Sequence, residues 1–143
     1  IVFGDWSSDV CSSDLHGGTI MKIIDETAFV VASRHTRRNC VTASVDRINF
    51  LHPVFIGNVV YTKASVNYVA TKSMEIGVTV EAEDLKTGKH THVGSAYLTF
   101  VALDEQNKAV SIPKVIPETE IEKKRFKAAQ QRYESRKAHR CVD

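Results

Sequence analysis

The sequence has few cysteines and no long apolar run. Its three cysteines, Cys11, Cys40 and Cys141, are odd in number and lack a spacing such as C-x-x-C, so they predict neither a disulfide framework nor a zinc site. No apolar stretch approaches the roughly 20 residues that cross a bilayer, and no charged-then-apolar leader precedes a cleavage site. We therefore expect a soluble, cytoplasmic protein from a reducing compartment.

A large excess of charge of one sign is also absent. The 143 residues carry a formal charge of +2, far from the concentrated positive field that non-specific nucleic-acid binding requires. Because 43% of the residues are hydrophobic, the chain can bury the core of one ordinary domain. The composition therefore predicts a single domain that binds neither nucleic acid nor membrane, and it fits a local phosphate site better.

Near its start the sequence lacks the period of a helix or a strand over residues 4–15. Residues 4–15, GDWSSDVCSSDL, repeat Ser-Ser-Asp units, and residues 5–15 match the in-frame translation of a common sequencing-library adapter. A natural Ser/Asp-rich disordered leader is the alternative. We expect residues 1–15 to be a non-native leader and the folded domain to begin at residue 16.

Residues 19–33, TIMKIIDETAFVVAS, have the period of a helix whose apolar stripe is too wide for a surface position. Such a helix should be buried against something broad, such as a sheet. Four strand-like runs follow without another helical pattern between them, which predicts an antiparallel sheet. The runs are residues 40–51, 59–69, 74–83 and 91–103.

Three details of these runs can be compared with the structure. In the first run the apolar residues occupy odd positions up to Val45 and even positions from Ile48 onward, which predicts a bulge near Asp46 and Arg47. The second run should place Val60, Ala64, Val66 and Tyr68 on one face. The third run alternates regularly, so one face should pack in the core and the other should be exposed to water. The apolar face carries Met74, Ile76, Val78, Val80 and Ala82, and the other face carries Glu75, Gly77, Thr79, Glu81 and Glu83.

The fold class that follows is α+β. We expect residues 16–117 to form one domain, in which a long buried helix lies against the antiparallel sheet. Residues 118–143 then form a charged C-terminal helix and tail, with acids near the start and bases near the end that suit the helix dipole.

Asp25 is the residue that most needs an explanation. At helical spacing it shares a side with Met21, Ala28 and Phe29 rather than with Lys22. A carboxylate there should be partly desolvated, and desolvation makes a carboxylate a better base. The alternative is a helix-edge aspartate paired with a neighbouring strand, and the residue pattern alone leaves both open.

His16, Gly17 and Gly18 stand where this helix starts. Residues without side chains let a ligand approach the unpaired N–H groups of the first turn, which can hold a developing oxyanion. An ordinary glycine-containing cap explains the pair equally well.

Four blocks of the sequence, HGGTIMKIIDE, VTASVDRINF, KSMEI and IPETEIEKKRF, together resemble the acyl-CoA thioesterase family of hotdog proteins, close to the brain-type acyl-CoA hydrolase and its bacterial single-domain relatives. The resemblance covers residues 16 to about 140. It implies the hotdog fold, a dimer joined edge to edge, and usually a trimer of such dimers. It also implies an acyl-CoA substrate, no cofactor besides the CoA of that substrate, and Asp25 as the catalytic aspartate.

The same resemblance implies a CoA groove, with much of the contact made by backbone. Its lining would be Ala43, Ser44 and Val45 on the first strand and Lys72, Ser73 and Met74 at the start of the third, with Arg132 on the last helix as a weaker member. Ordinary strand residues and a solvated arginine are the alternatives. The basic residues Arg34, His35, Arg37 and Arg38 could attract the CoA phosphates, although favourable charge at a helix C-terminus explains them as well.

One departure from the family pattern concerns the leader. Members normally carry an Asn a few residues before the HGG block, and it completes a site shared by two subunits, whereas this chain has Ser-Ser-Asp-Leu there. If the leader is foreign, we expect the chain as written to be impaired.

The expected reaction is hydrolysis of an acyl-CoA thioester by water that the Asp25 carboxylate activates, while N–H groups near Gly18 polarise the carbonyl oxygen. Direct attack by Asp25 through a mixed anhydride is equally compatible with the sequence. A non-catalytic acyl-CoA-binding module or sensor is the alternative function, and a hotdog dehydratase is disfavoured because no histidine of catalytic appearance accompanies the helix. His90 and His92 alternate on one strand without a third ligand, so we predict no metal.

Overall fold

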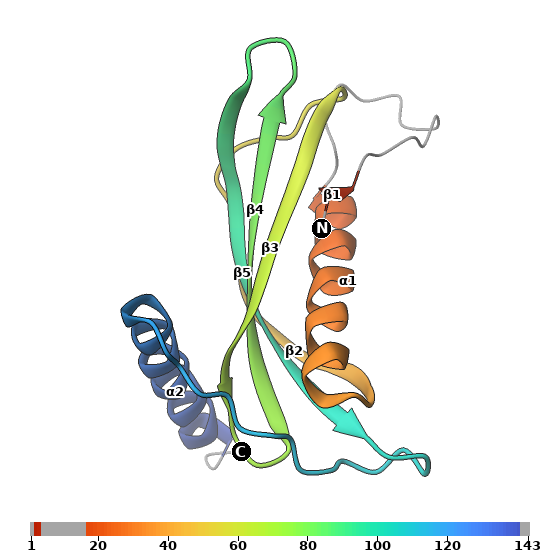
Figure 1. Ribbon diagram of the computed structural model, residues 1–143, viewed down its shortest axis with the longest axis vertical. Coiled ribbons are helices and arrows are strands. Elements are labelled where there is room, and N and C mark those ends of the chain that lie inside the picture. Colours follow the sequence, from red (N-terminus) through yellow and green to blue (C-terminus); the bar gives the residue numbers. More distant parts are fainter. Residues whose placement is uncertain (1, 4–16, 141–143) are drawn as a thin grey trace.

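The computed structural model describes residues 2–3 and 17–140, shown as coloured ribbon in Figure 1. Its elements in chain order are β1 (Val2–Phe3), α1 (Gly17–Thr36), β2 (Asn39–Phe50), β3 (Asn58–Val69), β4 (Ser73–Asp84), β5 (Lys89–Leu103) and α2 (Glu120–Arg140). The two helices and four long strands match the predicted order. Both helices start within two residues of their predicted positions, and α1 runs three residues further.

The strands form one antiparallel sheet in the order β1-β3-β4-β5-β2, so β2 is an edge strand. Figure 1 shows α1 along one face of the sheet and α2 against the lower part of the opposite face. We call these the inner and the outer face. The pair Val2–Phe3 joins β3 opposite Tyr61 and Val60. These two residues belong to the stretch 1–15 that the sequence predicts to be a non-native leader, and the adapter-like segment 5–15 lies outside the described residues.

The core lies between α1 and the inner face. Ile20, Ile24, Ala28 and Ala32 recur at the period of the helix and are buried. Every apolar residue of β4 in the predicted core set, from Met74 to Ala82, is also buried in this cluster. The prediction for the inner face of β4 is confirmed.

The predictions for the outer face need correction, because α2 covers part of it. Glu75, expected on a wet face, is only 1% exposed. Tyr68 does not share a face with Val66, because a register shift between the two residues turns its ring outward. The ring lies against α2, with centroids 5.2 Å from Phe126 and 5.5 Å from Tyr133.

Strand β2 contains two irregularities. The predicted bulge is confirmed, because the register with β5 shifts between Val45 and Arg47 and leaves Asp46 without a partner residue. A second shift between Thr42 and Ser44 leaves Ala43 unmatched, and the sequence did not predict it. Two bulges so close together leave two residues of this stretch unpaired and disrupt the ladder locally.

Helix α2 begins with a reciprocal cap. The hydroxyl of Thr119 accepts from the N–H of Glu122 at 3.2 Å, and the Glu122 carboxylate accepts from the N–H groups of Glu118 and Thr119 at 2.8 and 3.1 Å. The backbone N–H groups of Thr119 and Glu118 hold the pKa of Glu122 below its usual value. The contribution of this cap is therefore present near neutral pH and is lost as the pH falls through that lowered pKa.

We expect Thr119→Ala to lower the free energy of unfolding by about 1 kcal/mol, because the substitution leaves an N–H group of the first turn without its acceptor. Urea denaturation followed by circular dichroism measures the change. Lys127→Ala, at an exposed position on the same helix, is the matched control. Equal midpoints for the two variants would show that the cap does not contribute.

Candidate active site at the edge strand

Asp25 lies on the flank of α1 that faces the edge strand. The hydroxyl of Thr42 on β2 donates a hydrogen bond to Asp25 Oδ1 at 2.6 Å. Within one subunit Asp25 is exposed, so the expected partial desolvation is wrong for the single chain. The reason is that Ile20, Ile24 and Ala28 face the sheet. Asp25 therefore lies beside β2, which is the edge strand of the sheet in the described part of the chain.

Apolar residues flank this carboxylate. Met21 and Phe29, one turn before and one turn after Asp25, are 44% and 42% exposed. Val41 and Val45 of the neighbouring edge strand are exposed as well. Exposed apolar side chains grouped around a polar pair are typical of a surface that another protein molecule covers.

Thr42 is the site residue that sequence reasoning missed. It stands opposite Phe100, a buried residue of the inner face, and two positions after the buried Cys40. The alternation from Cys40 would have placed Thr42 on the side of α1, before the bulge at Ala43 changes the phase. The sequence signal was therefore present in the VTASVD block, although it needed the position of α1 to be useful.

The N-terminal end of α1 is open at Gly18. A side chain there would meet no atom of the described residues within 4 Å, whereas one at Gly17 would meet the Phe50 ring at 3.4 Å. The N–H groups of the first turn of a helix have no partner within the helix and point away from it along its axis. Gly18 lies about 10 Å from Asp25 along that axis, because each residue adds about 1.5 Å.

An apolar hollow adjoins this end of the helix. Its volume is about 320 Å³, and Gly17, Ile20, Phe50, Leu51, His52, Pro53, Val54 and Val93 line it. Most of these side chains are hydrocarbon, so the hollow suits an apolar group better than a charged one.

The two predicted CoA-binding blocks lie in neighbouring rows of the sheet. Ser44 on β2 and Glu75 on β4 both pair with Thr99 of β5, so the blocks are two strands, or about 10 Å, apart. Lys72, Ala43 and Val45 are exposed, and Ser44 and Ser73 are half-buried. Met74 is buried in the core. The prediction that Met74 lines a groove is therefore wrong for its side chain.

Arg132 lies on the outer face, across the sheet from Asp25. Its Nε and Nη2 donate to the two carboxylate oxygens of Glu75 at 3.1 and 2.6 Å, and its guanidinium stacks 3.9 Å from the Tyr97 ring centroid. The hydrogen bonds to Glu75 raise the pKa of Arg132 above its usual value. Arg132 and Asp25 of the same chain therefore lie on opposite sides of the sheet.

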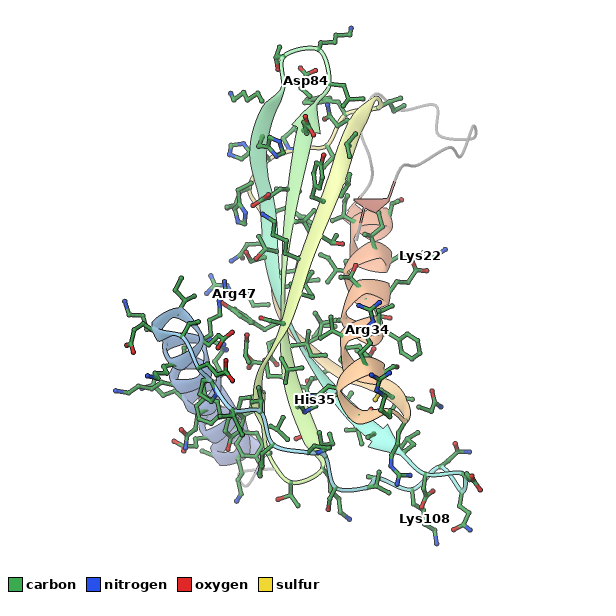
Figure 2. The ribbon with its side chains drawn as sticks, in the orientation of Figure 1. Lys22, Arg34, His35, Arg47, Asp84 and Lys108 are labelled. Carbon is green, nitrogen blue, oxygen red and sulfur yellow. The ribbon has the colours of Figure 1, made fainter. Side chains whose placement is uncertain are left out.

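The basic residues at the C-terminal end of α1 lie at the opposite end of the helix from Gly18, as Figure 2 shows for Arg34 and His35. Arg34, Arg37 and Arg38 are exposed, while the ring nitrogen Nε2 of His35 lies 2.7 Å from the Pro113 carbonyl oxygen. Arg37 has a φ of 56° at the end of the helix. Three of the four side chains thus remain accessible to an anion.

Two negative findings apply to residues 2–3 and 17–140. They contain no group of three or more His, Cys, Asp or Glu residues arranged to hold a metal ion. No helix among them has the length and apolar character needed to cross a membrane.

Comparison with known proteins decides the family. Residues 13–89 match the family model of the thioesterase superfamily. This chain belongs to that superfamily. Its hotdog architecture agrees with solved members: a Bacillus cereus acyl-CoA hydrolase superposes with a TM-score of 0.90 at 36% identity, over 99% of this chain and 87% of the other.

Relatives in this superfamily carry hydrolase names. The acyl-CoA thioester hydrolase YkhA of Bacillus subtilis, described as uncharacterized, is 44% identical over 123 residues, which is 86% of this chain and 72% of that protein. The rat cytosolic acyl coenzyme A thioester hydrolase is 42% identical over 128 residues, 88% of this chain but 34% of the rat protein. This chain thus spans about a third of the length of this mammalian relative.

A Staphylococcus aureus acyl-CoA hydrolase has been solved with butyryl coenzyme A and coenzyme A. It matches this chain with a TM-score of 0.88 at 38% identity, over 99% of this chain and 87% of the other. Further structures of that enzyme carry alanine in place of an asparagine, an aspartate or a threonine. The aspartate and the threonine are 17 positions apart there, as Asp25 and Thr42 are here.

Proposed function

We propose that this chain hydrolyses acyl-CoA thioesters to the free acid and CoA, with Asp25 as the catalytic carboxylate. The observation that carries the proposal is the hydrogen bond from Thr42 to Asp25, because its residue types and spacing match the pair replaced in the Staphylococcus aureus enzyme. Family membership and the hydrolase names of relatives support the same chemistry.

Thr42 leaves one oxygen of Asp25 free for catalysis. Its hydroxyl occupies Oδ1, so Oδ2 can accept a proton from water. The resulting hydroxide adds to the thioester carbonyl, the tetrahedral intermediate expels the CoA sulfur, and the proton held on Asp25 passes to the leaving thiolate. The same free oxygen could attack the carbonyl directly, giving a mixed anhydride that water then cleaves, and both routes produce one acid and one CoA thiol.

The oxyanion site and the base come from different subunits in this proposal. Gly18 and Asp25 of one helix are about 10 Å apart, and the N–H groups at Gly18 point away from Asp25, so they cannot meet at one carbonyl. A second copy that extends the sheet at β2 would cover the exposed apolar flank of Asp25 and would bring another α1 to it. The hexameric thioesterases among the structural relatives support such self-association, and we propose a trimer of edge-to-edge dimers.

The remaining contacts follow from where the candidate residues lie. The CoA part would rest against Ala43, Ser44, Val45, Lys72 and Ser73, and the exposed arginines at the C-terminal end of α1 would attract its phosphates. Arg132 keeps N–H groups that do not donate to Glu75, and these would bind CoA. Because Arg132 lies across the sheet from Asp25, that CoA would be bound at the active site of another subunit. The apolar hollow beside Gly17 would receive the acyl chain. We propose no cofactor, and a cytoplasmic location like that named for the rat relative.

Replacing Thr42 tests the site. We expect Thr42→Val to lower kcat by about tenfold or more, since a hydrogen bond to a charged group contributes about 1.5–3 kcal/mol. Thr42→Ser, which keeps the hydroxyl, should retain most of the activity. Steady-state release of free CoA thiol measures both variants, with Thr71→Val at an exposed position as the control. Full activity in Thr42→Val would remove Thr42 from the site.

A further inference from the structure

A buried carboxylate on the outer face binds two arginines of α2. Glu75 is 1% exposed, and Arg132 grips it with two hydrogen bonds. Arg136, one turn later on α2, lies 3.4 Å from Glu75 Oε2. A charge buried this deeply persists in a fold only when it is paired, and here both partners come from one helix.

Arg136 also reaches the edge strand. Its Nη1 donates to Oδ2 of Asp46, the bulge residue of β2 that has no partner in the ladder. Glu75 on β4 pairs with Thr99 on β5, and Thr99 in turn pairs with Ser44 on β2. Arg136 therefore crosses over β5 and joins the centre of the sheet to its edge. Figure 2 shows Arg47, the residue after Asp46, pointing toward the α2 side of the sheet.

The segment that Arg136 holds adjoins the candidate active site. The two bulges, at Ala43 and Asp46, lie directly after Thr42 on a strand that has β5 as its one partner within the sheet. A bulge disrupts the ladder locally and bends the strand, so a shift of this segment would re-aim Thr42 away from α1. A fixed Asp46 opposes that shift.

We propose that Glu75 is a positioning residue for hydrolysis: through Arg136 and Asp46 it fixes the bulged segment of β2 and so keeps Thr42 hydrogen-bonded to Asp25. This inference rests on the proposed function of the Asp25 and Thr42 pair. It differs from a purely structural role, in which Glu75 only attaches α2 to the sheet. A structural role alone predicts lower stability with an unchanged kcat in the protein that remains folded.

Asp46→Asn is the main test, because Asp46 is partly exposed. The substitution removes the negative charge of Asp46, while the buried carboxylate of Glu75 stays paired with Arg132. We expect kcat to fall about fivefold, KM to change less than twofold and the melting temperature to change little. Glu75→Gln should have the same effect on kcat in the folded fraction, with a larger loss of stability. Glu120→Gln, which removes an exposed ion pair with Lys123 on the same helix, is the matched control.

A double-mutant cycle identifies the route. If Asp46 acts through Thr42, adding Asp46→Asn to Thr42→Val should lower kcat less than twofold further. The same fivefold loss in both backgrounds, or an unchanged kcat for folded Asp46→Asn, would overturn the proposal. Asp25→Ala, measured alongside, separates the two hypotheses: a fully active Asp25→Ala refutes the proposed function, whereas an inactive one beside a neutral Asp46→Asn refutes the positioning role alone.

Discussion

Asp25→Ala is expected to lower the turnover of acyl-CoA at least about a hundredfold, the scale expected for loss of a general base. The substitution removes the acceptor of the water proton and leaves the hydroxyl of Thr42 without its partner. Its effect on folding should be small, because Asp25 is exposed within the subunit. Free CoA thiol, detected as it forms, measures the rate.

The neighbouring carboxylate provides a matched control. Glu26 is also exposed on α1, and its one ion pair within the described residues is with Lys22 at 3.9 Å. We expect Glu26→Ala to keep nearly all of the activity, since exposed pairs of this kind contribute little. Similar rates for the two variants would show that Asp25 has no special role.

Phe29→Lys should dissociate the assembly and abolish most of its activity. Phe29 lies one turn after Asp25, and its ring is exposed in the single chain although it belongs to the surface that we expect a second copy to cover. A lysine buried there without a partner opposes association. Because the subunits would no longer combine Gly18 with Asp25, turnover should fall about a hundredfold or more, as for a lost oxyanion donor.

The molecular mass measured by light scattering and the rate of CoA release should therefore fall together. Leu85→Lys, at an exposed apolar position of the β4–β5 turn, is the control and should leave both the mass and the rate unchanged. A stable Phe29→Lys monomer with the activity of the parent protein would contradict the shared site.

The fold was largely predictable because each long element has a clear period. The alternation of β4 identified its inner face residue by residue, and the phase shift of β2 located the bulge at Asp46. The outer face was not predictable in the same way. Alternation places Glu75 opposite the core, but it cannot show that a later helix covers that position and pairs the carboxylate with Arg132, 57 residues further along the chain.

The site was only partly predictable. Residue pattern alone left Asp25 as either a base or an aspartate paired with a strand, and the family resemblance favoured the base. The structure gives Asp25 the strand partner Thr42, and this contact suits a catalytic carboxylate equally well. Exposure of Asp25 was not foreseen, because a helical stripe does not reveal where the sheet ends. The segment that replaces the expected Asn lies outside the described residues, so its foreign origin stays a prediction.

The most direct test of acyl-CoA hydrolysis is to incubate the purified chain with a fatty acyl-CoA in excess and to count the free acid and the CoA thiol released for each subunit. We predict equal amounts of the two products, rising well above one equivalent per subunit even if the segment before residue 16 lowers the rate. An acyl-CoA that binds and is recovered intact would contradict the account, and it would identify the chain as a non-catalytic binding module or sensor.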